Sequence, residues 1–153
     1  MSTMPTMPIM SETSMGRIDV GITVANGTDR DRAAVGEIEE AAVRSVTLDR
    51  ALVDTGATLL CLPSDAIAQL GLQASREVRT NTANGPMRAR VYRNVELTVI
   101  GRTGTFDALE LPQGTTPLLG QIPLEALGLE PDLRNRRLRL LPDDEDDTYI
   151  TVL

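Results

Sequence analysis

The residues with the clearest chemical potential lie in one turn of the chain. The apolar run 51–53 leads directly into Asp54, Thr55 and Gly56. A carboxylate carried out of a hydrophobic run must be paired, hydrogen-bonded or protonated. The 153 residues form one domain with a single Asp-Thr-Gly. We therefore interpret Asp54 as half of a catalytic carboxylate pair, the other half coming from a second copy of the chain.

Composition narrows the chemistry to carboxylates. The chain has no histidine, which excludes histidine-based triads and histidine-ligated zinc. Cys61, the only cysteine, cannot form an internal disulfide, and its apolar neighbours predict a buried, unreactive thiol in a reducing, cytoplasmic setting. The acidic run 143–147 has no loop glycine and is interpreted as solvated rather than as a calcium site. We expect no metal and no cofactor.

The charge balance also bears on partners. The formal net charge is -7 and the sequence pI is about 4.6, which argues against nucleic acid and anionic membranes as partners. No segment approaches the roughly 18 apolar residues of a membrane helix. The leader 1–15 is rich in Met, Ser, Thr and Pro and has no basic start, so we expect a disordered tail and not a secretory signal.

The elements that must position Asp54 follow from local patterns. Arg17–Val24 alternates and predicts a half-buried strand, and Asn26-Gly27 predicts a turn before a solvated loop over Thr28–Arg32. The chain from Glu37 to Val53 is expected to be extended, with a helix over Ile38–Arg44 as the alternative. Thr58–Leu62 predicts a short strand. Pro63, Ser64 and Gly71 bound a two-turn helix.

Two hairpins are predicted in the second half of the chain. Glu77–Thr82 and Met87–Tyr92 are polar arms around the turn 83–86, so this hairpin must project from the body or cover something. Val95–Ile100 and Thr105–Leu111 alternate more cleanly and form the second hairpin.

The remaining segments partly repeat the pattern around Asp54. Leu118, Leu119 and Gly120 are followed by a short helix over Pro123–Leu127 and a Leu-Gly-Leu exit, as in the first half-motif, but without the acid. Leu138–Leu141 is a strand candidate, and Thr148–Leu153 is a β-prone hexapeptide that ends the chain.

With the Asp-Thr-Gly-Ala turn, the Asn-Gly hairpin and the Leu-Leu-Gly turn in this order, the sequence resembles the retropepsin-like aspartic proteases. It is most similar to their small, single-domain prokaryotic members, over roughly 16–139. The resemblance implies a mostly β fold, a single-domain closed acid-protease-like β-barrel with one or two short helices, active as a homodimer. The domain would span 16–141, and 142–153 would hold the acidic segment and a C-terminal strand that joins its symmetry mate.

The resemblance also assigns roles to residues. The two Asp54 side chains would hold a water, Thr55 would cross-bond at the base of the site, and Gly56 would bind substrate backbone. Supporting residues would be Ala57, Leu118, Leu119 and Gly120. The flap over an extended peptide substrate would comprise Thr82, Ala83, Asn84, Gly85, Pro86 and Met87.

Two facing carboxylates share one proton, so one Asp54 would act as base on the water and the other as acid towards the peptide carbonyl. Ala57 has no hydroxyl to donate to the pair, which predicts activity in mildly acidic to near-neutral buffer. The few aromatic residues predict an aliphatic pocket that prefers apolar substrate residues. The alternatives are a catalytically silent dimeric module that grips extended peptides, and a β-barrel that only self-associates.

Overall fold

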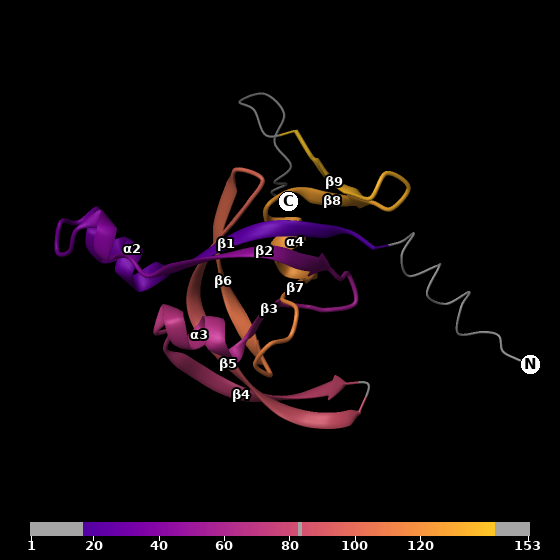
Figure 1. Ribbon diagram of the computed structural model, residues 1–153, viewed down its shortest axis with the longest axis horizontal. Coiled ribbons are helices and arrows are strands. Elements are labelled where there is room, and N and C mark those ends of the chain that lie inside the picture. Colours follow the sequence, from indigo (N-terminus) through magenta and orange to yellow (C-terminus); the bar gives the residue numbers. More distant parts are fainter. Residues whose placement is uncertain (1–16, 83, 143–153) are drawn as a thin grey trace, which may run out of the picture.

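The chain folds into strands with three short helices, as the computed structural model shows for residues 17–82 and 84–142 (Figure 1). The strands are β1 (Asp19–Asn26), β2 (Ser45–Val53), β3 (Leu60–Pro63), β4 (Ala74–Thr82), β5 (Gly85–Val99), β6 (Arg102–Leu111), β7 (Leu118–Leu119), β8 (Leu129–Asp132) and β9 (Arg137–Leu140). The helices are α2 (Gly27–Ala34), α3 (Ser64–Leu70) and α4 (Gln121–Ala126), with a 3-10 turn at Glu40–Ala42. The prediction of a mostly β fold is confirmed, whereas one or two helices was too few.

Seven strands form one sheet in the order β1-β2-β7-β3-β6-β5-β4, and β1 also pairs with β5. This additional pairing turns six of the strands into a ring, which we describe as a ring rather than as a barrel, and leaves β4 outside it. The strands β8 and β9 form a separate two-stranded sheet. Figure 1 shows α2 at the left end of the molecule, the β4–β5 hairpin along its lower side and β8–β9 at its upper side.

The core fills the ring with aliphatic side chains. Strands β3 and β5 contribute Leu60, Leu62, Val95 and Leu97, all fully buried, and α3 adds Leu70. Because successive strand residues point to opposite faces, the residues that alternate with these core positions face away from the core and can contribute to a site.

The segment Thr28–Arg32, expected to be a solvated loop, is part of helix α2. The sequence Asn26-Gly27 is typical of a turn, but here the Asn26 side chain accepts a hydrogen bond from Asp29 N at 2.9 Å and caps the helix. An asparagine at this position satisfies a free amide of the first turn, and the acidic Asp29 complements the positive end of the helix. The prediction of a loop was wrong because an Asn-Gly dipeptide can form a turn and can also begin a helix, with the asparagine as its N-cap.

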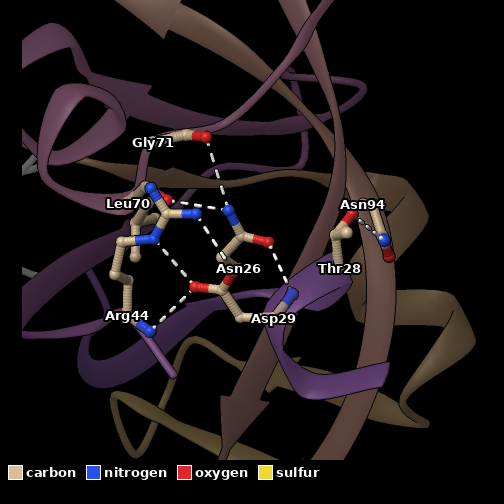
Figure 2. A network of polar contacts seen from close by, with 7 residues as sticks. All are labelled: Asn26, Thr28, Asp29, Arg44, Leu70, Gly71 and Asn94. Carbon is tan, nitrogen blue, oxygen red and sulfur yellow. Dashed lines mark hydrogen bonds and ion pairs between the residues drawn. The ribbon is translucent and has the colours of Figure 1, made fainter. Parts of the chain in front are cut away.

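A polar network holds this helix against the body (Figure 2). Asp29 is buried and accepts hydrogen bonds from Arg44 Nε at 2.8 Å, Arg44 Nη2 at 3.0 Å and the Arg44 backbone N–H at 3.1 Å. These bonds hold the pKa of Asp29 at about 2. Asn26 also donates to Leu70 O at 2.9 Å, and the Arg44 guanidinium lies over Gly71. The network therefore joins the end of β1 to the end of α3.

Helix α3 is confirmed close to its predicted bounds, with Gly71 at φ 62° as its left-handed C-cap. Strand β2 begins at Ser45 rather than Glu37, and the alternative helix over Ile38–Arg44 is limited to the 3-10 turn. Helix α4 begins at Gln121, two residues before Pro123.

The two strands expected at Met87–Tyr92 and Val95–Ile100 are one continuous strand, β5. The register shifts between Tyr92 and Val95, and Asn94 has φ 61°. A bulge of this kind absorbs an extra residue and bends the strand without ending it. The long strand therefore joins the core directly to the projecting hairpin. Strand β8 was not predicted.

Several expectations lie outside the described residues: the leader 1–15, Ala83, the acidic run 143–147 and the strand Thr148–Leu153. Within 17–82 and 84–142, no helix has the length and apolar character needed to cross a membrane.

Candidate active site

Asp54 lies at the end of β2, in the loop that leads to β3. Ser45, at the start of β2, pairs with Ala25 beside α2, so the nine residues of the strand place Asp54 at the opposite end. Parallel pairing of Leu52 and Val53 with Leu118 and Leu119 holds that end of the strand. The Asp54 N–H donates to Leu119 O at 3.0 Å. The position of the acid is thus fixed by β7, more than sixty residues later in the chain.

The turn itself orients the carboxylate. Gly56 N donates to Asp54 Oδ1 at 2.9 Å, and Ala57 N donates to the Asp54 carbonyl oxygen at 3.0 Å. No hydrogen bond reaches Oδ2 from any described residue. Asp54 is half-buried, whereas Thr55 and Gly56 are exposed. One carboxylate oxygen is therefore held by the backbone, and the other remains available to a water or a second acid.

The loop after the turn rests on the start of α4. Gln121 N donates to Ala57 O at 2.8 Å, and Ile122 N donates to Thr58 O at 2.9 Å. A Cβ at Gly120 would lie 2.8 Å from Ala57 O and closer still to Leu59 O. Only glycine fits this approach of two backbones without a shift. The structure thus places Gly120 directly against the Asp54 loop, with Leu118 and Leu119 in the adjoining strand.

Cys61, on β3, lies near this loop but is not a candidate nucleophile. The side chain is buried, and burial together with the negative charge of Asp54 raises the pKa of its thiol to about 11. A thiol with this pKa is protonated at neutral pH and is therefore a poor nucleophile. Cys61 pairs with Leu118, which in turn pairs with Leu52, two residues before Asp54, so Cys61 lies on the sheet face that Leu52 and Leu118 share.

An apolar wall continues from Cys61 towards the projecting hairpin. Residues directly paired across strands share one face of a sheet. Leu109 pairs with Cys61 on β3 and with Val91 on β5, and Cys61 also pairs with Leu118. Ala89 lies two residues before Val91 and so points to this face too.

We call this surface the inner face, although it is opposite to the side of β3 that Leu60 and Leu62 turn to the core. Its apolar residues are Cys61, Val78, Ala89, Val91, Leu109 and Leu118, with Val78 joining through its pairing with Ala89. All six are buried or half-buried. The sequence analysis did not single out Val78, Ala89, Val91 and Leu109 as site residues. Alternation in residues 87–91 signals an apolar face, but not that this face continues through Leu109 and Cys61 to Leu118.

The predicted flap is the hairpin of β4 and β5. At its tip Thr82 Oγ1 donates to Gly85 O at 2.7 Å, and Asn84 N donates to Thr82 Oγ1 at 3.1 Å. Gly85 has φ 104°, a conformation that favours glycine. Pro86 and Met87 are exposed and lie at the start of β5, directly after Gly85. The hydrogen bonds of the described tip residues therefore stay within the hairpin, which projects away from the ring.

Nothing in residues 17–82 and 84–142 forms a cluster of three or more cysteine and acidic side chains suited to a metal ion. The chemistry that the site offers therefore depends on one oriented carboxylate, the exposed backbone of Gly56 and the apolar inner face. Thr55 has no described partner within the chain. Its expected cross-bond requires a second subunit.

A sequence model of the family described as aspartyl protease matches residues 40–121, from the 3-10 turn to the first residue of α4. The matched span covers more than half of the chain and includes the Asp54 loop, the hairpin and Gly120. A search of curated proteins found no significant match.

Proposed function

Because the chain belongs to the aspartyl protease family, we propose that it is an aspartic endopeptidase that works as a homodimer. Each subunit contributes one Asp54, and the two carboxylates activate a water between them. The observation that carries this proposal is the geometry of Asp54. Its Oδ1 is held by Gly56 N, while Oδ2 has no partner in the described chain. A single half-buried acid with one free oxygen suits a shared site.

The dyad mechanism follows from simple electrostatics. Two adjacent carboxylates cannot both ionise cheaply, so the pair retains one proton, as is general for aspartic proteases. The ionised Asp54 removes a proton from the water as it attacks the peptide carbonyl. The protonated Asp54 hydrogen-bonds the developing oxyanion and then supplies the proton for the leaving amine. This chemistry uses no metal and forms no covalent intermediate.

The supporting residues act on geometry. Thr55 cross-bonds at the base of the dimeric site, and Gly56 offers its exposed backbone to the substrate. The position of the Asp54 loop is set by the segment beneath it, which comprises Leu118, Leu119 and Gly120. The close approach of Gly120 to Ala57 O supports this role. The flap from Thr82 to Met87 covers an extended peptide.

Substrate preference follows from the inner face. The six residues named for it are aliphatic apart from the buried thiol of Cys61, and the cation beside them, Arg76, is paired with Asp107. Burial of an apolar substrate side chain against this face is favourable by about 25 cal/mol per Å². We therefore expect cleavage beside aliphatic residues. Because Ala57 has no hydroxyl to donate to the Asp54 pair, we expect this activity in mildly acidic to near-neutral buffer.

The test compares the wild type with Asp54→Asn on a peptide library, while sedimentation gives the mass in solution. Asp49→Asn is a matched control, since Asp49 is exposed on the same strand. Cleavage and a dimer are expected for the wild type and the control, and loss of cleavage without loss of the dimer for Asp54→Asn. Cleavage that persists in Asp54→Asn would refute the mechanism. A dimer that binds peptides but never cuts them would favour a silent peptide-binding module.

A further inference from the structure

The hairpin of β4 and β5 has a charge opposite to that of the rest of the chain. Residues 74–93 contain five arginines and one acid, a net charge of +4, whereas the other 133 residues carry -11. The arginines are Arg76, Arg79, Arg88, Arg90 and Arg93. A cationic arm on an acidic protein attracts negatively charged partners to that arm and repels them elsewhere.

Three of the five arginines lie on the side of the hairpin away from the inner face, whereas Arg76 pairs with Val91 and forms an ion pair with Asp107 at 3.4 Å. Glu77 pairs with Arg90 and Arg79 pairs with Arg88, and these positions alternate with Val78 and Ala89. We call Glu77, Arg79, Arg88 and Arg90 the outer face. All four side chains are exposed. The hairpin therefore presents an apolar surface on one side and a cationic surface on the other.

The charges of the outer face are incompletely balanced. Arg88 Nε forms an ion pair with Glu77 Oε1 at 3.1 Å, and Arg90 lies beside Tyr92 and Glu110. Arg79 has no ion-pair partner among the described residues, and it lies directly opposite Arg88. Like charges opposite each other destabilise a strand pair. A bound anion would remove this cost.

A cavity of about 490 Å³ adjoins the same surface. Glu77, Arg88 and Arg90 line it from the hairpin, and Ser64 and Glu110 line it from the body. The two arginines and two glutamates in this lining balance each other in charge, so the uncompensated cation is Arg79, beside the cavity; guanidinium groups bind carboxylates in a bidentate geometry.

We propose that the outer face binds Asp and Glu side chains of the protein substrate, outside the apolar residues that flank the cleaved bond. This inference rests on the proposed function and adds a second requirement to the substrate: an acidic segment beside an aliphatic cleavage site. The flap then contributes to selection in two ways, by apolar contact on its inner face and by charge on its outer face.

Binding to the inactive Asp54→Asn protein tests the inference without relying on cleavage. Three labelled peptides share an aliphatic centre and carry acidic, neutral or basic flanks, and fluorescence anisotropy gives their affinities. We expect the acidic peptide to bind most tightly and the basic one least, with the difference shrinking between about 50 mM and about 300 mM NaCl. Arg79→Gln should lower the affinity for the acidic peptide roughly two- to fivefold, the range for the loss of one exposed ion pair.

Arg134→Gln is the matched control. Arg134 is also exposed and without a described ion-pair partner, but it lies at the tip of the β8–β9 hairpin, on the other side of the molecule (Figure 1). This change should leave all three affinities as they were. Arg79→Glu should reduce the affinity for the acidic peptide further and raise that for the basic one.

Equal affinities for acidic and basic peptides, or equal effects of Arg79→Gln and Arg134→Gln, would overturn the inference. Tighter binding of a single-stranded RNA oligonucleotide than of the acidic peptide would overturn it as well. Cleavage by the wild type keeps the two proposals apart. If flank charge has no effect but peptides are cut, only the charge preference fails; if acidic peptides bind and none is cut, only the protease assignment fails.

Discussion

Replacing Gly120 with alanine tests whether the backbone contact beneath the Asp54 loop positions the proposed catalytic acid. Gly120 has φ -87°, a conformation open to any residue, so the substitution introduces no backbone strain of its own. Its new methyl group would lie 2.8 Å from Ala57 O and 3.0 Å from Ala57 C, and closer still to Leu59 O. These are backbone atoms and cannot rotate away. The loop or the start of α4 must therefore move.

The size of the effect follows from these distances. Carbon and oxygen in contact normally stay at least about 3.3 Å apart, so relief of the clash requires a displacement on the order of 1 Å. Overpacking of this kind costs about 1–3 kcal/mol of unfolding free energy. A shift of about 1 Å near a reacting group can cost about a hundredfold in rate. We therefore expect Gly120→Ala to lose about a hundredfold in kcat while it remains folded.

Gly21→Ala is the matched control. A Cβ there would lie 3.4 Å from Asp49 O, an ordinary contact, and Gly21 has no positive φ. Peptide cleavage under saturating substrate gives kcat, and urea unfolding gives the free energy of each variant. The control should keep its activity and gain a few tenths of a kcal/mol. Wild-type kcat in Gly120→Ala, with unchanged stability, would refute the argument that this contact sets the position of Asp54.

Three further outcomes are expected. Asp29→Asn should lower the unfolding free energy at neutral pH. Because the pKa of the Asp29 carboxyl is held at about 2 in the folded protein against 3.8 when unfolded, the difference from wild type should shrink as the pH falls below about 4 and be lost below about 2. A difference independent of pH in urea titrations would contradict this. Arg102→Ala removes the donors to Leu127 O, Gly128 O and Leu141 O at 2.9, 3.0 and 2.6 Å. We therefore expect the unfolding free energy to fall by about 2–3 kcal/mol and amide exchange to become faster over 129–140. Unchanged amide exchange over 129–140 would contradict this. Cys61 should resist iodoacetamide at pH 7.5 in the folded protein, as mass spectrometry would show, since burial raises its pKa to about 11; rapid alkylation would count against the buried thiol.

Local signals were enough to predict several parts of this protein. The helix α3 has its start at Ser64 and its stop at Gly71, because caps depend on residues within one turn. The hairpin β4–β5 followed from its turn residues and polar arms. The Asp54-Thr55-Gly56 turn was evident from an apolar run that ends in an acid and a glycine, and the aspartyl protease family was recognised from these motifs in order.

Other features depend on residues far apart in the chain. The helix α2 was missed because its stability comes partly from Arg44, fifteen residues beyond Asp29. The unbroken β5 was missed because its bulge is held by pairing with β6. Contacts of this kind are set by packing, and no local pattern contains them.

The sequence by itself determined the candidate for the reactive group: a lone acid in an Asp-Thr-Gly turn, in a chain with no histidine. The tertiary structure decided what surrounds that acid. Pairing register, which one residue of slip would reverse, put Val78 and Ala89 on one face of the hairpin and Arg79 and Arg88 on the other. It also brought Gly120 against Ala57 and Leu59, more than sixty residues earlier, because only the folded ring places β7 beside the Asp54 loop.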